Sequence, residues 1–201
     1  MSTKRIGFFG GTFDPPHIGH LILAGEAASQ FQLNRLLWVL TPDPPHKQDD
    51  SITPIEHRMN MLQAMIAHNP IFEISYLEIN RPGPHYTVDT VKLLKQQEPD
   101  AEIILLIGGD SLADLPTWRF ASDLITAVSN IGIMRRPNDF TDLIALETQL
   151  PGIKNKIQFI DALLQPVSSS ELRRRIKSNE MARYYLTNEV YEYIEKNNLY
   201  R

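Results

Sequence analysis

The chain has 201 residues, of which 42% are hydrophobic and 22% are charged, and its formal net charge is −4. This composition is typical of a globular protein that buries one substantial core, and the negative charge disfavours broad binding to nucleic acid or to an anionic membrane. Cysteine is absent, which excludes disulfides, thiolate metal sites and cysteine nucleophiles. The sequence shows neither a signal-peptide pattern nor a run of about 18 apolar residues, so we expect a cytoplasmic protein.

Apolar runs rich in β-forming residues alternate with segments of helical periodicity. The predicted strands cover, in chain order, residues 5–9, 35–40, 72–79, 103–107, 130–134 and 156–160. This alternation predicts an α/β fold, a Rossmann-like open parallel sheet with helices on both faces. Neither repeats nor a linker divide the chain, so we expect a single domain over 1–201, on which a C-terminal helical part from about residue 168 packs.

Two of the predicted helices have N-terminal capping signals. The first is predicted to start with Thr53 as its N-cap and Glu56 as the partner in a capping box. Ser168, followed three residues later by Glu171, repeats the pattern. A final helix is predicted over 188–198.

The unusual residues of the chain come directly after the predicted strands. The segments that follow the six strands read, in order, GGTFDPPH, TPDPPHK, GPHYT, GGDS, RRP and VSSSELR. In an open parallel sheet the carboxyl ends of the strands form the ligand crevice at the topological switch point. We therefore expect all six segments to converge on one binding site.

The stretch GGTFDPPHIGH, residues 10–20, has the properties of a phosphate-binding turn. Gly10 and Gly11 let the backbone approach a ligand closely, and a helix that begins near His17 presents free N–H groups and a positive dipole end. The stretch is neither a P-loop nor a G-x-G-x-x-G fingerprint. A small phosphorylated ligand is the interpretation that these features favour.

His17 and His20 lie three residues apart, hence on one face of the predicted helix. A metal site would need a third ligand, and no His-Glu-x-x-His pattern is present. Capping or packing roles stay open, as does a role in which both imidazoles donate to phosphate oxygens. The helix N-terminus disfavours a charged imidazole in the empty site, whereas a bound polyphosphate raises the imidazole pKa.

Two cations follow strands in the same way. Lys47 lies in a stiff proline-containing turn, and Arg173 lies one turn into the helix that Ser168 caps. Either side chain can face the phosphates or be a solvated surface charge.

GGTFDPPHIGH resembles the G-x-F-D-P-x-H-x-G-H signature of the nucleotidylyltransferase superfamily, and VSSSELR resembles its second signature, usually Ile-Ser-Ser-Thr-x-x-Arg. Val167 and Ser170 depart from the second signature, both in capping or packing roles. PPHK, PHYT, IGGDSLADLPTW and the final NNLYR resemble the nicotinate-nucleotide adenylyltransferase family in particular. The resemblance runs from Ile6 to Arg201.

This resemblance implies transfer of the adenylyl group of ATP, bound with Mg²⁺, to nicotinate mononucleotide, which gives nicotinate adenine dinucleotide and pyrophosphate. It implies that no protein side chain ligates the metal. The implied catalytic residues are His17, His20, Lys47 and Arg173. The implied ATP-binding residues are Gly10, Gly11, Thr12, Phe13, His20, Gly108, Asp110, Arg135, Ser168 and Ser169. The implied nicotinate-nucleotide-binding residues are Thr12, Lys47, Tyr86, Thr87 and Trp118.

By the same resemblance, Asp110 contacts the adenosine ribose and Arg135 stacks on adenine, while Tyr86 and Trp118 enclose the pyridine ring. Without the family, Trp118 fits a core position equally well. Other readings stay open: another adenylyltransferase of the superfamily, acting on nicotinamide mononucleotide, pantetheine phosphate or a flavin, or a nucleotide-sensing module without turnover. We expect no nucleic-acid, membrane or obligatory protein partner.

Overall fold

The computed structural model describes residues 3–43, 52–135, 142–163 and 166–201. Six strands form one parallel sheet in the order β3-β2-β1-β4-β5-β6. The strands are β1 (Arg5–Gly11), β2 (Arg35–Leu40), β3 (Phe72–Ser75), β4 (Glu102–Gly108), β5 (Asn130–Met134) and β6 (Ile157–Phe159). The α-helices are α1 (Ile18–Gln30), α2 (Ile55–Ile66), α3 (Thr87–Gln97), α4 (Gly109–Asp114), α5 (Ala121–Ala127), α6 (Leu143–Gln149), α7 (Ser169–Lys177) and α8 (Asn188–Lys196). Short 3₁₀ turns are η1 (Leu115–Thr117), η2 (Ile153–Asn155) and η3 (Arg183–Tyr185).

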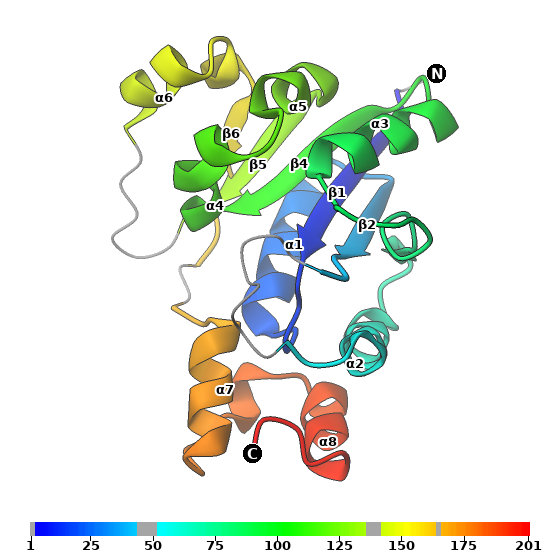
Figure 1. Ribbon diagram of the computed structural model, residues 1–201, viewed down its shortest axis with the longest axis vertical. Helices are drawn as coiled ribbons and strands as arrows, with labels where there is room; N and C mark the ends of the chain where they lie inside the picture. The colour runs from blue at the N-terminus through cyan, green and yellow to red at the C-terminus, as the bar shows by residue number, and fades with distance from the viewer. Residues whose placement is uncertain (1–2, 44–51, 136–141, 164–165) are drawn as a thin grey trace.

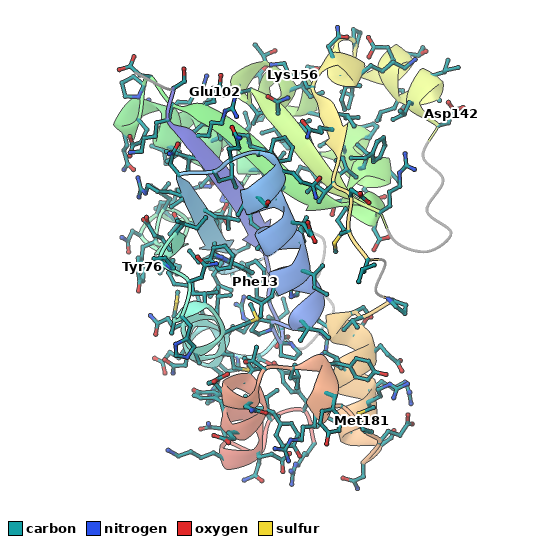
Figure 2. The ribbon with its side chains drawn as sticks, turned by 180° about the vertical axis from the view of Figure 1, so that it is seen from behind. Phe13, Tyr76, Glu102, Asp142, Lys156 and Met181 are labelled. Carbon is teal, nitrogen blue, oxygen red and sulfur yellow. The ribbon has the colours of Figure 1, made fainter. Side chains whose placement is uncertain are left out.

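The two faces of the sheet pack against different helices, as expected for an α/β fold (Figures 1 and 2). Alternate residues of one strand point to opposite faces, so Phe8 belongs to an apolar cluster with residues of α3, α4, α5 and α6, whereas Phe9 belongs to a second cluster with residues of α1, α2, α7 and α8. The sheet is buried on both sides, which explains why its strands read as continuous apolar runs. The predicted Rossmann-like architecture is confirmed.

The switch point of the sheet lies between β1 and β4. From β1 the chain moves outward through β2 and β3, then returns to pair β4 with the other edge of β1. β1 pairs with β2 as far as Gly11 but with β4 only as far as Phe9. Gly10 and Gly11 therefore border an opening at the carboxyl end of the sheet, which is where such folds bind ligands.

Several predicted boundaries differ from the observed ones by one to four residues, and for two of them the cause is that tertiary contacts use the backbone differently. Helix α2 starts at Ile55 with Pro54 as N-cap, not Thr53, because the Thr53 N–H donates to Asp14 and the Thr53 carbonyl accepts from Arg58. Strand β3 ends at Ser75, four residues before the predicted end. There the Ser75 hydroxyl accepts from a backbone N–H two residues on and the chain turns.

Helices α7 and α8 lie beyond the carboxyl end of β1, with α2 beside α8 (Figure 1). Ser168 caps α7 as predicted, because its side-chain oxygen accepts from the Glu171 N–H at 3.3 Å. In α8 the buried residues are Val190 and Ile194, which join the same core as α1 and α2. Within the described part of the chain, no helix is both long enough and apolar enough to cross a membrane.

Candidate active site

A cavity of about 470 Å³ opens at the carboxyl end of the sheet, beside the switch point. Every strand supplies part of its wall, directly or through the segment that follows it, as the positions of the unusual residues predicted. The predicted site residues that line it are Gly10, Gly11, Thr12, His17, His20, Tyr86, Thr87, Gly108, Asp110 and Trp118. Thr41, Met134 and Val167 complete the contributions of β2, β5 and the segment after β6.

His17 and His20 form a stacked pair at the start of α1. Their ring centroids are 3.6 Å apart with an interplanar angle of 20°, and His17 is the N-cap of the helix. The His17 backbone N–H donates to Nδ1 of His20 at 3.1 Å, so in the neutral His20 ring the proton must be on Nε2. His20 is therefore set to act as a hydrogen-bond donor through Nε2.

Two glycines lie close to aromatic rings at this part of the cavity. A Cβ on Gly19 would lie 3.1 Å from Nδ1 and 3.2 Å from Cε1 of His17. A Cβ on Gly11 would lie 3.0 to 3.2 Å from three carbon atoms of the Phe13 ring. At both positions the bare backbone allows an aromatic ring to approach within van der Waals contact.

The opposite end of the cavity is aromatic and faces a helix N-terminus. Tyr86 is the N-cap of α3, and Thr87 is its first residue. Trp118 is the C-cap of turn η1, and both aromatic side chains line the cavity. The first N–H groups of α3, those of Thr87 and Val88, have no acceptor in the described part of the chain. This end is suited to a flat ring that carries an anionic substituent.

Asp110 is a further polar residue of the cavity wall. It follows β4 in the first turn of α4, next to Gly108, and both line the cavity. A Cβ on Gly108 would meet no atom within 4 Å, so a side chain there would extend into open space and occupy ligand volume. Among the described residues, His, Cys, Asp and Glu side chains form no group of three able to hold a metal ion.

Other predicted site residues lie outside the cavity wall. Phe13 follows β1, is 2% exposed and packs edge-on to His20 with centroids 5.1 Å apart, in the region between the sheet and the C-terminal helices (Figure 2). Phe13 therefore packs against His20 and does not line the cavity. The Arg135 guanidinium lies over the Phe159 ring, 3.8 Å from the centroid. Lys47 lies outside the described residues.

The residues predicted at the start of α7 contact the signature stretch, residues 10–20. Ser168 caps α7, and the Ser169 hydroxyl donates to the Pro15 carbonyl at 2.9 Å. Arg173 donates through Nη1 to the Asp14 carbonyl at 2.7 Å. Its other guanidinium nitrogens have no acceptor among the residues that the structure describes.

Sequence reasoning missed a buried polar group beneath the aromatic end of the cavity. The Thr90 hydroxyl donates to Glu78 at 2.8 Å and accepts from Arg81 at 2.9 Å. Glu78 and His85 are almost fully buried and touch the cavity. Burial raises the pKa of Glu78, and burial followed by the nearby Arg81 charge lowers the pKa of His85. Both shifts favour the uncharged side chains.

Arg58 was also missed. Its side chain is 2% exposed, and its guanidinium donates to four backbone carbonyls at 2.8 to 3.1 Å, those of Thr12, Thr41, Pro42 and Thr53. Arg58 thus joins the segment after β1 to both ends of the segment that contains Lys47. In the sequence it is one charged residue on a helix, and only the fold shows that it points inward.

Comparison with known proteins identifies the family. The family profile described as cytidylyltransferase-like matches residues 8–175. A probable nicotinate-nucleotide adenylyltransferase from Thermomicrobium roseum is 42% identical over 173 residues, which cover 86% of this chain and 80% of that protein. The nicotinate-nucleotide adenylyltransferase of Bacillus subtilis is 39% identical over 197 residues, 98% of each chain. The chain belongs to the nicotinate-nucleotide adenylyltransferase family.

Solved structures agree with this family in their fold. The Plasmodium falciparum nicotinic acid mononucleotide adenylyltransferase complexed with NaAD matches with a TM-score of 0.80 and 22% identity, over 98% of this chain and 97% of that chain. A putative nicotinate-nucleotide adenylyltransferase from Vibrio parahaemolyticus matches with a TM-score of 0.71 and 17% identity, over 98% and 96% of the two chains. As a member of the family, the chain is a nucleotidyltransferase with the Rossmann-like fold that the sequence predicted.

Proposed function

We propose that this protein transfers the adenylyl group of Mg²⁺-bound ATP to nicotinate mononucleotide, giving nicotinate adenine dinucleotide and pyrophosphate in NAD biosynthesis. The observation that carries the proposal is that one cavity joins two dissimilar ends. The His17–His20 pair and the start of α1 supply donors for phosphates at one end. Tyr86, Trp118 and the start of α3 supply an aromatic, anion-binding pocket at the other.

At the phosphate end, the proposed reaction is a direct displacement. A phosphate oxygen of the mononucleotide forms a bond to the α-phosphorus of ATP, and the bond from that phosphorus to the bridging oxygen breaks, releasing pyrophosphate. The nucleophile is already ionised at neutral pH, so the protein need not supply a base or a covalent intermediate. The role of the protein is to align two anions and to stabilise charge on the transferred phosphate.

The histidines are the proposed donors to the ATP phosphates. The hydrogen bond to Nδ1 of His20 leaves its Nε2–H group as a donor, which we place at the α-phosphate. Gly10, Gly11 and Thr12 lie alongside, and Asp110 is the proposed acceptor for the ribose hydroxyls. The remaining proposed contacts to ATP are Lys47, Arg135, Ser168, Ser169 and Arg173. Mg²⁺ enters as part of the substrate, on the phosphate oxygens.

At the pyridine end, the proposed selection of acid over amide rests on the start of α3. The N–H groups of Thr87 and Val88 are donors, and the helix dipole favours a negative group in front of them. A carboxylate accepts from such donors through either oxygen, whereas a carboxamide places its NH₂ donor against them. Tyr86 and Trp118 are the proposed stacking partners of the ring. No protein partner enters the proposed reaction.

A pyrophosphate-release assay tests the function. We expect release from Mg²⁺-ATP with nicotinate mononucleotide, and only background release with pantetheine phosphate or without an acceptor. The control is His20→Ala, which should lower kcat by roughly 100-fold or more because its contact is strongest in the transition state. Faster release with pantetheine phosphate would assign the chain to another adenylyltransferase, and nucleotide binding without release would indicate a sensing module.

A further inference from the structure

Tyr200, which follows α8, reaches back to the signature stretch between β1 and α1. Its hydroxyl donates to Oδ1 of Asp14 at 2.7 Å, across 186 positions of sequence. Asp14 is 3% exposed, and its Oδ2 accepts from the Thr53 N–H at 3.2 Å. Asp14 lies three residues before His17 and does not line the cavity. The carboxylate therefore helps to hold the turn, and within the described residues Tyr200 is its side-chain donor.

The backbone beside this carboxylate is held as well. The Asp14 carbonyl accepts from Arg173, and the Pro15 carbonyl accepts from Ser169, both from the first two turns of α7. Side-chain and backbone bonds therefore fix Asp14 and Pro15 from three separate segments of the chain. These two residues lead directly into His17, the N-cap of α1, so any displacement of the turn moves the histidine pair.

The conformation of Tyr200 is consistent with a specific role for its side chain. Its φ is +66°, a left-handed conformation that favours glycine and is rare for a bulky residue. The side chain that this conformation directs toward Asp14 is half-buried. Burial, followed by the Asp14 charge, raises the pKa of the Tyr200 hydroxyl, so the hydroxyl keeps the proton that it donates.

We propose that the Tyr200 hydroxyl is a positioning group for the transfer reaction: by holding Asp14 it fixes the turn that places His17 and His20 against the phosphates. The expected effect on kcat rests on the proposed function. The expected effect on the position of the histidines rests only on the contacts described above. Tyr200 does not line the cavity, so its loss affects the alignment of the histidines and leaves the pyridine pocket intact.

The test compares Tyr200→Phe with a matched control, Tyr193→Phe. The Tyr193 hydroxyl, in α8, bonds Nδ1 of His57 and the Asn60 side chain at 3.0 Å each, and it does not reach the signature stretch. Both variants lose one tyrosine hydroxyl in the same part of the molecule. A loss of activity that came only from weaker packing of α8 would appear in both.

We expect kcat to fall by roughly 10-fold in Tyr200→Phe, since small misplacements of catalytic groups lower rates steeply, with the KM for nicotinate mononucleotide changed less than about twofold. Tyr193→Phe should keep kcat within about twofold, whereas the melting temperature should fall in both variants. A kcat within twofold of wild type in Tyr200→Phe, or equal losses of kcat in both variants, would overturn the proposal.

A second measurement does not depend on turnover. In spectra of ¹⁵N-histidine-labelled protein, Tyr200→Phe should move the ring signals of His17 and His20, whereas Tyr193→Phe should move that of His57. Unchanged His17 and His20 signals in Tyr200→Phe would refute the positioning role. If wild-type protein showed no transfer activity, the proposed function would fail while this spectral comparison still decided whether Tyr200 positions the histidines.

Discussion

At the scale of single residues, the site depends on the contact between His17 and Gly19. A methyl group at Gly19 would stand 3.1 Å from the His17 ring, closer than an ordinary contact, and His17 in turn stacks on His20. Because the two rings are in contact, a shift of the His17 ring would displace the His20 ring or disrupt their stacking. The geometry of the histidine pair is therefore sensitive to a residue that contacts no substrate in the proposed mechanism.

We expect Gly19→Ala to lower kcat by roughly 10-fold, because the imidazoles must shift by a few tenths of an ångström. Gly25 provides the matched control in the same helix, since a Cβ there would meet no atom within 4 Å. Gly25→Ala should leave activity unchanged and raise the free energy of unfolding by roughly 0.5–1 kcal/mol, the helix-propensity gain of alanine over glycine. Equal activities of the two variants would contradict this account of Gly19.

At the scale of elements, helix α3 and the segment before it form one unit around Glu78. Thr90 of α3 joins Glu78 to Arg81, and Arg81 also donates to the carbonyls of Pro84 and Tyr86 at 3.2 and 3.4 Å. The aromatic N-cap of α3 is thus supported from beneath by a buried polar group. The group combines a cation with a carboxyl whose pKa is raised by burial.

Glu78→Gln tests this unit through the pH dependence of stability. A folded-state pKa above the unfolded value of about 4.3 means that the folded state binds the proton more tightly. The stabilising effect of the protonated group is then lost as pH rises through the folded pKa. Urea unfolding between pH 4 and 8 should show the variant gaining stability relative to wild type as pH increases. Parallel curves for the two proteins would mean that the carboxyl is ionised in both states.

The elements were largely predictable from the sequence because they depend on local patterns. Strand and helix alternation follows from apolar periodicity, and the Ser168 cap from two residues three positions apart. The start of α2 was not predictable from a local pattern, because the Thr53 backbone is hydrogen-bonded to Asp14 and Arg58. The same limit applies to Tyr200 and Arg58, whose partners lie up to 186 positions away, and no local pattern encodes such contacts.

The site was predictable to a similar degree. Gly10, Gly11, His17 and His20 stand out by type and spacing, and the structure places all four in the lining of the cavity. Glu78 has the appearance of an ordinary strand residue in the sequence, and its burial is a result of how β3 ends and α3 begins. Residues that support the cavity from behind are therefore the ones that sequence reasoning missed.

At the scale of the whole molecule, we propose that residues 1–201 form a single domain. One apolar core runs from Phe9 and Trp38 of the sheet to Val190 and Ile194 of α8, so the part from about residue 168 shares its core with the sheet. Chemical unfolding followed by tryptophan fluorescence and by far-ultraviolet circular dichroism should give one transition with the same midpoint. Separate midpoints would indicate that α7 and α8 unfold independently.

The central claim is that one cavity aligns ATP with an acid mononucleotide, whose carboxylate is bound at the start of α3. The most direct test is a competition in which the protein, Mg²⁺-ATP and equal amounts of nicotinate and nicotinamide mononucleotide react together, with both dinucleotide products measured by mass. We predict that the acid product dominates by roughly 100-fold, the consequence of about 3 kcal/mol of unmatched donors and lost charge-assisted bonds. Equal amounts of the two products, or an excess of the amide product, would contradict the account.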